Sequence, residues 1–198
     1  MTLWFTASLW VILFLLQVSG VPLHYFAIYP GRVGGLFGIL TAPLVHGGYI
    51  HLLANSITLV VLGSALLYGY PRSAKIVVPV VYLGTGLLVW LFARPAYHLG
   101  ASGLSFGIFF FVLIIGALRR DRLAVALSMA VFFLYSGMIW GVLPNEPHIS
   151  FESHIFGALI GSALAFLLKN KDPRPPQLHY DWEGEDDDDD AEWERFTK

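Results

Sequence analysis

Six long apolar stretches, separated by short polar breaks, dominate the first 168 residues of this chain. Each is close to the 20 or so apolar residues that a helix needs to cross a bilayer. The pattern predicts an all-α, polytopic membrane protein whose helices form a compact six-span bundle. The expected spans are 3–18, 50–68, 74–92, 102–118, 123–142 and 154–168.

The breaks between these stretches contain the residues that stop helices. Proline and glycine clusters recur there, as in Tyr70-Pro71-Arg72 and in the segment from Pro144 to Pro147. Proline cannot continue a helix without losing a backbone hydrogen bond. The stretch at 3–18 lacks a basic start and a small-residue cleavage pattern, so we expect an anchor rather than a signal peptide.

Four of the polar residues within the apolar stretches are candidates for a site. His51 and Asn55 lie four positions apart, which places them on one face of a helix. Ser102 and His154 begin two other stretches. Polar side chains are costly in hydrocarbon, by about 2.5–3.5 kcal/mol for a charged group at the helix centre. Their presence in three spans therefore indicates a functional site.

Composition and charge agree with membrane insertion. Hydrophobic residues make up 56% of the 198 positions and charged residues 13%, and the mean hydropathy is +0.65. There are no cysteines, which excludes disulfides, thiol nucleophiles and cysteine-based metal sites. Phosphate loops, dinucleotide fingerprints and basic stripes for nucleic acid are also missing, so we expect no cofactor and no nucleic-acid partner.

Basic residues in the short loops predict the orientation. Eight of them fall in the second and fourth loops and at the start of the tail, against two in the first and third loops. The positive-inside rule then places both termini in the cytoplasm. The starts of the stretches that carry His51, Ser102 and His154 all fall at the outer face. We expect a multi-pass protein of a bacterial inner (plasma) membrane.

These residues suggest hydrolytic chemistry. The backbone N–H of Ser102 would be one of the unpaired donors at a helix start, a favourable position for a developing oxyanion. The serine hydroxyl needs a base, and His154 is the candidate. His51 and Asn55 would add oxyanion donors. The spans contain no carboxylate to orient the histidine, so the expected arrangement is a dyad.

A dyad requires the stretches at 102–118 and 154–168 to approach closely. Gly103 and Gly107 are four apart on one, and Gly157 and Gly161 are four apart on the other. Such small-residue pairs let membrane helices pack tightly. Phe106, one turn after Ser102, could pack on the His154 ring.

The chain from about Thr41 to Phe166 resembles the rhomboid intramembrane serine proteases. Three elements carry the resemblance: His46-Gly-Gly-Tyr-Ile-His-Leu-Leu-Ala-Asn55, Gly100-Ala-Ser-Gly103, and His154-Ile-Phe-Gly157 followed by Gly161. The resemblance implies a six-helix core, Ser102 as nucleophile, His154 as base, and oxyanion contacts from His51 and Asn55. It also implies cleavage of transmembrane protein substrates near the outer face, and lateral access of the substrate past the fifth span.

The resemblance is incomplete at two places. Many rhomboids have a Trp-Arg pair in the first loop, where this chain reads Leu36-Phe-Gly-Ile-Leu40, and a tyrosine often stands where this chain has Phe106. The core is also similar to that of rhombosortases, a rhomboid branch that processes C-terminal membrane anchors. No residue separates the two branches.

Several alternative interpretations remain. Ser105 competes as nucleophile because residues 103–107 match Gly-x-Ser-x-Gly, although that motif belongs to a strand–turn–helix context. His46 is expected to support the first loop rather than to bind metal, since no His-Glu-x-x-His pattern is present and no metal site is predicted. The other four histidines are expected in solvent-exposed loops or the tail, and they are His24, His98, His148 and His179.

Two other functions compete with proteolysis. One is an inactive rhomboid-like protein that binds membrane helices, although such relatives usually lack Ser102 or His154. The other is a small transporter with polar residues along a pathway, which predicts inverted repeats that the sequence does not display.

The last part of the chain differs from the rest. Eleven of the fourteen acidic residues lie at or beyond Asp172. High charge without an apolar core is typical of disorder. We expect two units, a protease domain at 1–169 and a disordered cytoplasmic acidic tail at 170–198. Trp182, Trp193 and Phe196 could serve as a docking motif for a cytoplasmic partner.

Overall fold

The computed structural model describes residues 2–144 and 150–174, and in this part of the chain the regular elements are all helical. Five helices are long and apolar enough to cross a membrane. They are α1 (Thr2–Ser19), α3 (Tyr49–Gly69), α4 (Pro71–Phe92), α5 (Ser102–Arg119) and α8 (Phe151–Leu168). The protein is therefore an all-α, polytopic membrane protein, and each of these helices matches an expected span to within a few residues.

The fifth expected span, 123–142, differs from the prediction. It is broken into α6 (Arg122–Tyr135) and α7 (Gly137–Trp140) around Ser136. Serine and glycine weaken a helix without forbidding it, so packing can break the helix at this point. At 14 residues, α6 measures only about 21 Å along its axis, shorter than the roughly 30 Å hydrocarbon core.

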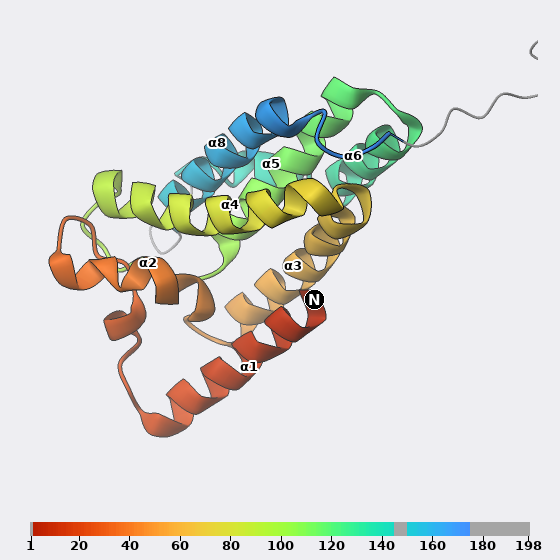
Figure 1. Cartoon of the computed structure of the whole chain (residues 1–198). Coiled ribbons are helices and arrows are strands. Elements are labelled where there is room, and N and C mark those ends of the chain that lie inside the picture. The colour runs from red at the N-terminus through yellow and green to blue at the C-terminus, as the bar shows by residue number, and fades with distance from the viewer. Residues whose placement is uncertain (1, 145–149, 175–198) are drawn as a thin grey trace, which may run out of the picture.

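Helix α5 occupies the centre of the bundle (Figure 1). It packs against α8, α6, α3 and α4, and two-thirds of its residues are buried. Helix α8 contacts both α5 and α4, whereas α1 packs mainly against α3 at the side of the bundle. The helix that begins with Ser102 is thus held by neighbours on all sides.

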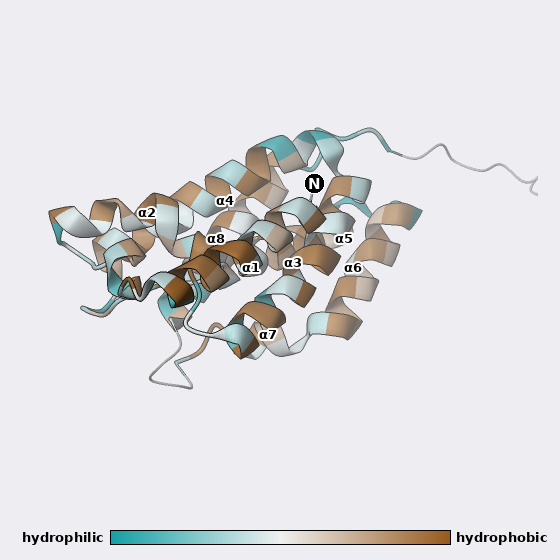
Figure 2. Cartoon of the chain, turned by 90° about the horizontal axis from the view of Figure 1, so that it is seen from below, coloured by the Kyte–Doolittle hydropathy of each residue, from teal (hydrophilic) through white to brown (hydrophobic). Residues whose placement is uncertain are grey.

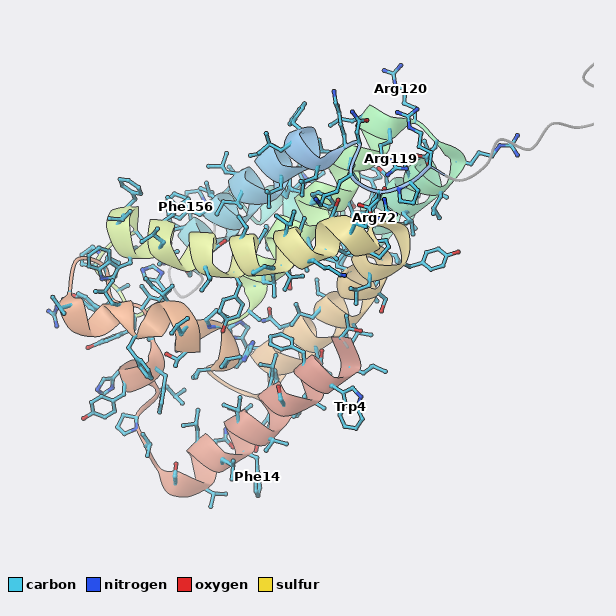
Figure 3. All side chains as sticks on the ribbon, in the orientation of Figure 1. Trp4, Phe14, Arg72, Arg119, Arg120 and Phe156 are labelled. Atoms are coloured by element: carbon cyan, nitrogen blue, oxygen red, sulfur yellow. The ribbon has the colours of Figure 1, made fainter. Side chains whose placement is uncertain are left out.

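The outer surface of the helices is apolar. Trp4 on α1 is 83% exposed and Phe14 is 57% exposed, and both point away from the bundle (Figure 3). Hydrophobic residues cover the helices, whereas hydrophilic residues gather near their ends (Figure 2). Apolar side chains facing outward are expected where lipid replaces water as the solvent.

The segment between α1 and α3 contains four short helices, which are η1 (Leu23–Phe26), η2 (Val33–Leu36), α2 (Gly38–Thr41) and η3 (Ala42–Leu44). Two parts of this segment pack closely on each other through Gly35 and Gly38. A side chain at Gly35 would collide with the Tyr29 backbone, and one at Gly38 would collide with the Ala27 backbone.

Asp172 connects the start of α4 to the end of α5, at the end of the bundle opposite Ser102. Its carboxylate accepts hydrogen bonds from the backbone N–H groups of Arg72 (2.7 Å) and Ser73 (3.1 Å) at the start of α4. The Arg119 guanidinium donates to the Asp172 carbonyl (3.1 Å) and pairs with Asp121 (2.8 Å). Arg72, Arg119 and Arg120 all lie at this end (Figure 3).

Asp172 is therefore buried against the helices, although the residues on either side of it are exposed. Pro173 also accepts a hydrogen bond from Arg119 through its carbonyl (3.0 Å). The acidic run and the aromatic residues Trp182, Trp193 and Phe196 lie outside the described residues, so the division into a 1–169 domain and a tail stays a prediction.

Replacing Asp172 with alanine is expected to lower the free energy of unfolding by about 1–2 kcal/mol, because the first N–H groups of α4 lose their capping acceptor. The midpoint of thermal unfolding in detergent measures this. Lys171→Ala, a change at the exposed neighbouring residue, serves as the control and should leave the midpoint unchanged. Equal midpoints for both variants and wild type would contradict the capping role.

Candidate active site

Ser102 is the first residue of α5, directly after a tight turn. Gly100 in that turn has a φ of +108°, a conformation that favours glycine. The His51 ring lies against Gly100, so that a Cβ there would be 2.9 Å from His51 Cε1. The turn therefore needs glycine both for its backbone angle and for the space that the imidazole occupies.

His154 lies on the first turn of α8 and faces Ser102. Its Nε2 is 2.9 Å from Ser102 Oγ, and its Nδ1 is 2.8 Å from the Gly141 carbonyl oxygen. A carbonyl can only accept a hydrogen bond, so the ring proton belongs on Nδ1. Nε2 is then free to accept the proton of the serine hydroxyl. His154 as a whole residue is 8% exposed.

Phe106 holds the face of the His154 ring. The two rings stack with centroids 4.0 Å apart and an interplanar angle of 5°. Gly141 closes this arrangement from the other side, because a Cβ at Gly141 would be 2.8 Å from the Phe106 ring. One backbone carbonyl and one aromatic face thus fix the orientation of the imidazole without a carboxylate.

Glycine contacts bring α5 and α8 to this distance. A Cβ at Gly157 would collide with the Gly103 carbonyl oxygen, and a Cβ at Gly161 would collide with the Gly107 carbonyl oxygen. The helix backbones therefore touch at two successive turns. This is the close approach that paired small residues permit in membrane helices.

His51 on α3 and His46 in the preceding loop contact the turn before Ser102, and Asn55 lies one helical turn after His51. The Asn55 amide nitrogen donates to the His51 carbonyl (3.0 Å), and since an amide NH₂ carries two hydrogens, one remains for another acceptor. His46 and His51 have ring centroids 5.2 Å apart. His46 Nε2 accepts a hydrogen bond from the Ala101 backbone N–H (3.3 Å), next to Ser102.

His46 should make stability depend on pH. Burial, and secondarily the nearby His51, lower the pKa of His46 from 6.5 to about 4. The folded protein then binds this proton more weakly than the unfolded chain does. Its contribution to stability is complete above about pH 6.5 and is lost as the pH falls towards about 4.

Glutamine at position 46 can still accept from Ala101 but does not titrate. His46→Gln is therefore expected to reduce the loss of thermal stability between about pH 7 and about pH 4.5. Thermal unfolding in detergent at a series of pH values measures this. His98, whose pKa burial also lowers, contributes with the same sign and leaves a residual slope. An unchanged slope in His46→Gln would contradict this role.

Ser105, the rival nucleophile, does not share this environment. It lies within helix α5 rather than on a strand–turn–helix elbow, and it is 2% exposed. Its hydroxyl has no hydrogen-bond partner among the described residues. His154 is therefore hydrogen-bonded to Ser102 and not to Ser105.

Two residues of this region were not anticipated from the sequence. Nothing in the sequence indicates the Gly141 carbonyl, because any residue supplies one. His98 was expected in a solvent-exposed loop, and this is wrong, since its side chain is 2% exposed. His24 is exposed as expected, whereas His148 and His179 lie outside the described residues. Within residues 2–144 and 150–174, no group of three or more His, Asp or Glu side chains is placed so that it could hold a metal ion.

Comparison with known proteins gives matches over most of the chain. The family model of the Rhomboid domain matches residues 33–171. An uncharacterized protein of Mycobacterium tuberculosis is 35% identical over 174 residues, covering 83% of this chain and 72% of the relative. A Mycobacterium leprae protein is 35% identical over 67% of this chain and 56% of its own length. RHOMBOID-like protein 2 of Arabidopsis thaliana is 31% identical over 73% of this chain and 44% of its own length.

Proposed function

Because this chain belongs to the rhomboid family, we propose that it is an intramembrane serine protease that cleaves a peptide bond in or beside a transmembrane segment of other membrane proteins. The observation that carries this proposal is the hydrogen bond of 2.9 Å between Ser102 Oγ and His154 Nε2. The Gly141 carbonyl supports it further, by favouring the tautomer in which Nε2 is a base.

Acylation begins with Ser102. Its Oγ bonds to the scissile carbonyl carbon while its proton passes to His154 Nε2. The carbonyl oxygen becomes an oxyanion near the N-terminus of α5, where backbone N–H groups are unpaired. His51 and Asn55 are the proposed side-chain donors to that oxyanion. When the C–N bond breaks, His154 returns the proton to the leaving amine.

Deacylation reverses the roles. A water molecule attacks the acyl carbon while His154 Nε2 takes its proton, and the bond to Ser102 Oγ breaks as the hydroxyl is restored. The half-buried Ser102 hydroxyl at the end of a helix is a position that water can reach. A site in the middle of α5 would lie in hydrocarbon instead.

The proposed orientation places this site at the outer face of a bacterial inner membrane. Ser102 and Arg119 are the two ends of α5, so the active site and the arginine-rich end lie on opposite sides of the bundle. Arginines are favoured on the cytoplasmic side. The matching mycobacterial proteins are consistent with a bacterial setting.

Purified protein in liposomes, incubated with a panel of single-span substrates, tests the proposal. Wild type is expected to cleave at least one substrate within or next to its membrane segment, as mapped by mass spectrometry of the products. Ser102→Ala, which keeps the fold, should cleave none. Substrate binding without cleavage by wild type would favour a non-catalytic, helix-binding protein instead.

A further inference from the structure

His98 ties together segments that are distant in the sequence. Its backbone N–H and carbonyl pair with Ile28 across an isolated antiparallel bridge (2.9 Å each), joining the loop before α5 to the loop after α1. Two residues later, the Gly100 N–H donates to the Ala42 carbonyl (2.8 Å). The backbone that leads into Ser102 is therefore anchored on the first loop.

The His98 side chain makes hydrogen bonds through both ring nitrogens. Nε2 is 3.0 Å from the Arg94 carbonyl, and Nδ1 is 2.6 Å from Ser150 Oγ. The carbonyl can only accept, so Nε2 carries the proton and Nδ1 accepts from the Ser150 hydroxyl. Burial lowers the pKa of His98, which favours this neutral form, although the Arg94 carbonyl and the Glu152 charge partly offset the effect.

Ser150 continues the contact into α8. Its hydroxyl oxygen is 2.7 Å from Ser153 Oγ, so Ser150 can accept from Ser153 while it donates to His98. Ser153 immediately precedes His154. A chain of hydrogen bonds thus runs from the loop before α5 to the residue next to the proposed base.

Residues 98–102 lead into α5, and residues 150–154 lead into α8 and form its first turn. Hydrogen bonds join these two segments at both of their ends. His98 and Ser102 are four positions apart in the sequence, and so are Ser150 and His154. The His98–Ser150 bond closes one end of this pair of segments, and the Ser102–His154 bond closes the other. An ion pair between Arg94 and Glu152 (3.3 Å) links the same two segments.

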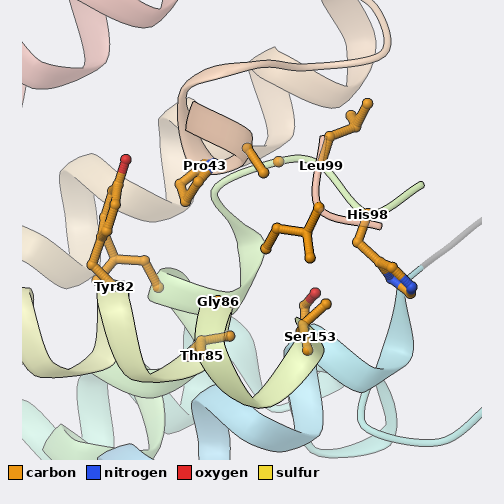
Figure 4. A pocket seen from close by; sticks show the side chains of 13 residues that line it. Pro43, Tyr82, Thr85, Gly86, His98, Leu99 and Ser153 are labelled. Atoms are coloured by element: carbon orange, nitrogen blue, oxygen red, sulfur yellow. The ribbon is translucent and has the colours of Figure 1, made fainter. Parts of the chain in front are cut away.

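The packing between these segments leaves a small cavity. A cavity of about 20 Å³, room for about one water molecule, lies between α4 and the starts of α5 and α8. His98 and Ser153 line it together with Thr85 (Figure 4). Because side chains do not fill this space, the hydrogen bonds at its edge add to the glycine contacts between α5 and α8 in holding the two segments together.

We propose that His98 is a positioning residue, which through Ser150 sets the distance and angle between Ser102 and His154. This inference rests on the proposed proteolytic function. A displacement of about 1 Å between reacting groups can cost up to about 10²-fold in rate, so the loss of one such tie is expected to be measurable.

The test compares the inactivation rate by a fluorophosphonate, together with kcat and KM on a cleaved substrate, in wild type and variants. His98→Phe keeps the ring but removes both hydrogen bonds. It is expected to lower kcat and the inactivation rate by roughly 10-fold, with KM little changed. His98→Asn can still accept from Ser150 and should recover most of that loss. His24→Phe, the same change at an exposed histidine, is the matched control and should behave as wild type.

Ser150→Ala removes the same hydrogen bond from the other side. If His98 acts through Ser150, the double variant should be no slower than the slower single variant. Full additivity of the two losses, or an unchanged rate in His98→Phe, would overturn the positioning role. If His98→Phe does not fold, an unchanged rate in Ser150→Ala overturns it.

Ser102→Ala separates this inference from the proposed function. Wild-type labelling that equals that of Ser102→Ala would overturn the proposed function, and the inference with it. Ser102-dependent labelling that is insensitive to His98 and Ser150 would overturn the inference alone.

Discussion

Alanine in place of His154 is expected to reduce peptide-bond cleavage by at least about 10³-fold, because the serine hydroxyl then has no base to accept its proton. The loss should appear in kcat, since His154 does not need to touch the substrate before the chemical step. Removing the imidazole also deprives the Phe106 ring of its stacking partner, so the variant should be somewhat less stable but still folded. Steady-state cleavage of a single-span substrate in liposomes measures the effect.

The control for this prediction is an exposed histidine. His24→Ala removes an exposed imidazole from the first loop, outside the dyad. This variant should cleave at the wild-type rate. If His154→Ala retained more than about a tenth of wild-type activity while remaining folded, His154 could not be the general base.

Alanine at Gly157 or Gly161 is expected to have the second large effect. The added methyl group would collide with a backbone carbonyl oxygen of α5, and neither backbone can move away without separating the two helices. Overpacking of this kind typically costs about 1–3 kcal/mol, and more where backbone is involved. Because α8 carries His154, the separation should also reduce cleavage, by about 10²-fold if the dyad distance grows by about 1 Å.

Thermal unfolding and cleavage rates should be measured together on these variants. Gly34→Ala is the matched control, because a Cβ at Gly34 meets no atom within 4 Å. Wild-type stability and activity in Gly161→Ala would show that α5 and α8 do not depend on the glycine contact.

Much of the fold follows from the apolar pattern. Hydrocarbon imposes uninterrupted helices of a known length, so the five long spans can be located from sequence to within a few residues. The break between α6 and α7 was not predicted, because Ser136 and Gly137 are both tolerated in membrane helices and only packing decides whether the helix continues. The fold of the first loop was likewise not predictable from periodicity.

The candidate site was partly predictable for a different reason. His51, Asn55 and His154 are residue types that are rare in apolar spans, and Ser102 begins such a span, so their chemistry stands out against the background. The contacts that orient them do not stand out. The Gly141 carbonyl belongs to the backbone, and the burial of His98 depends on Ile28 and Ser150, which are 70 and 52 residues away in the sequence.

Labelling by a fluorophosphonate, followed by identification of the modified peptide, tests the central claim most directly. The account predicts a single adduct on Ser102 in wild type, and none in Ser102→Ala. Equal labelling of the two proteins, or an adduct on Ser105, would contradict it.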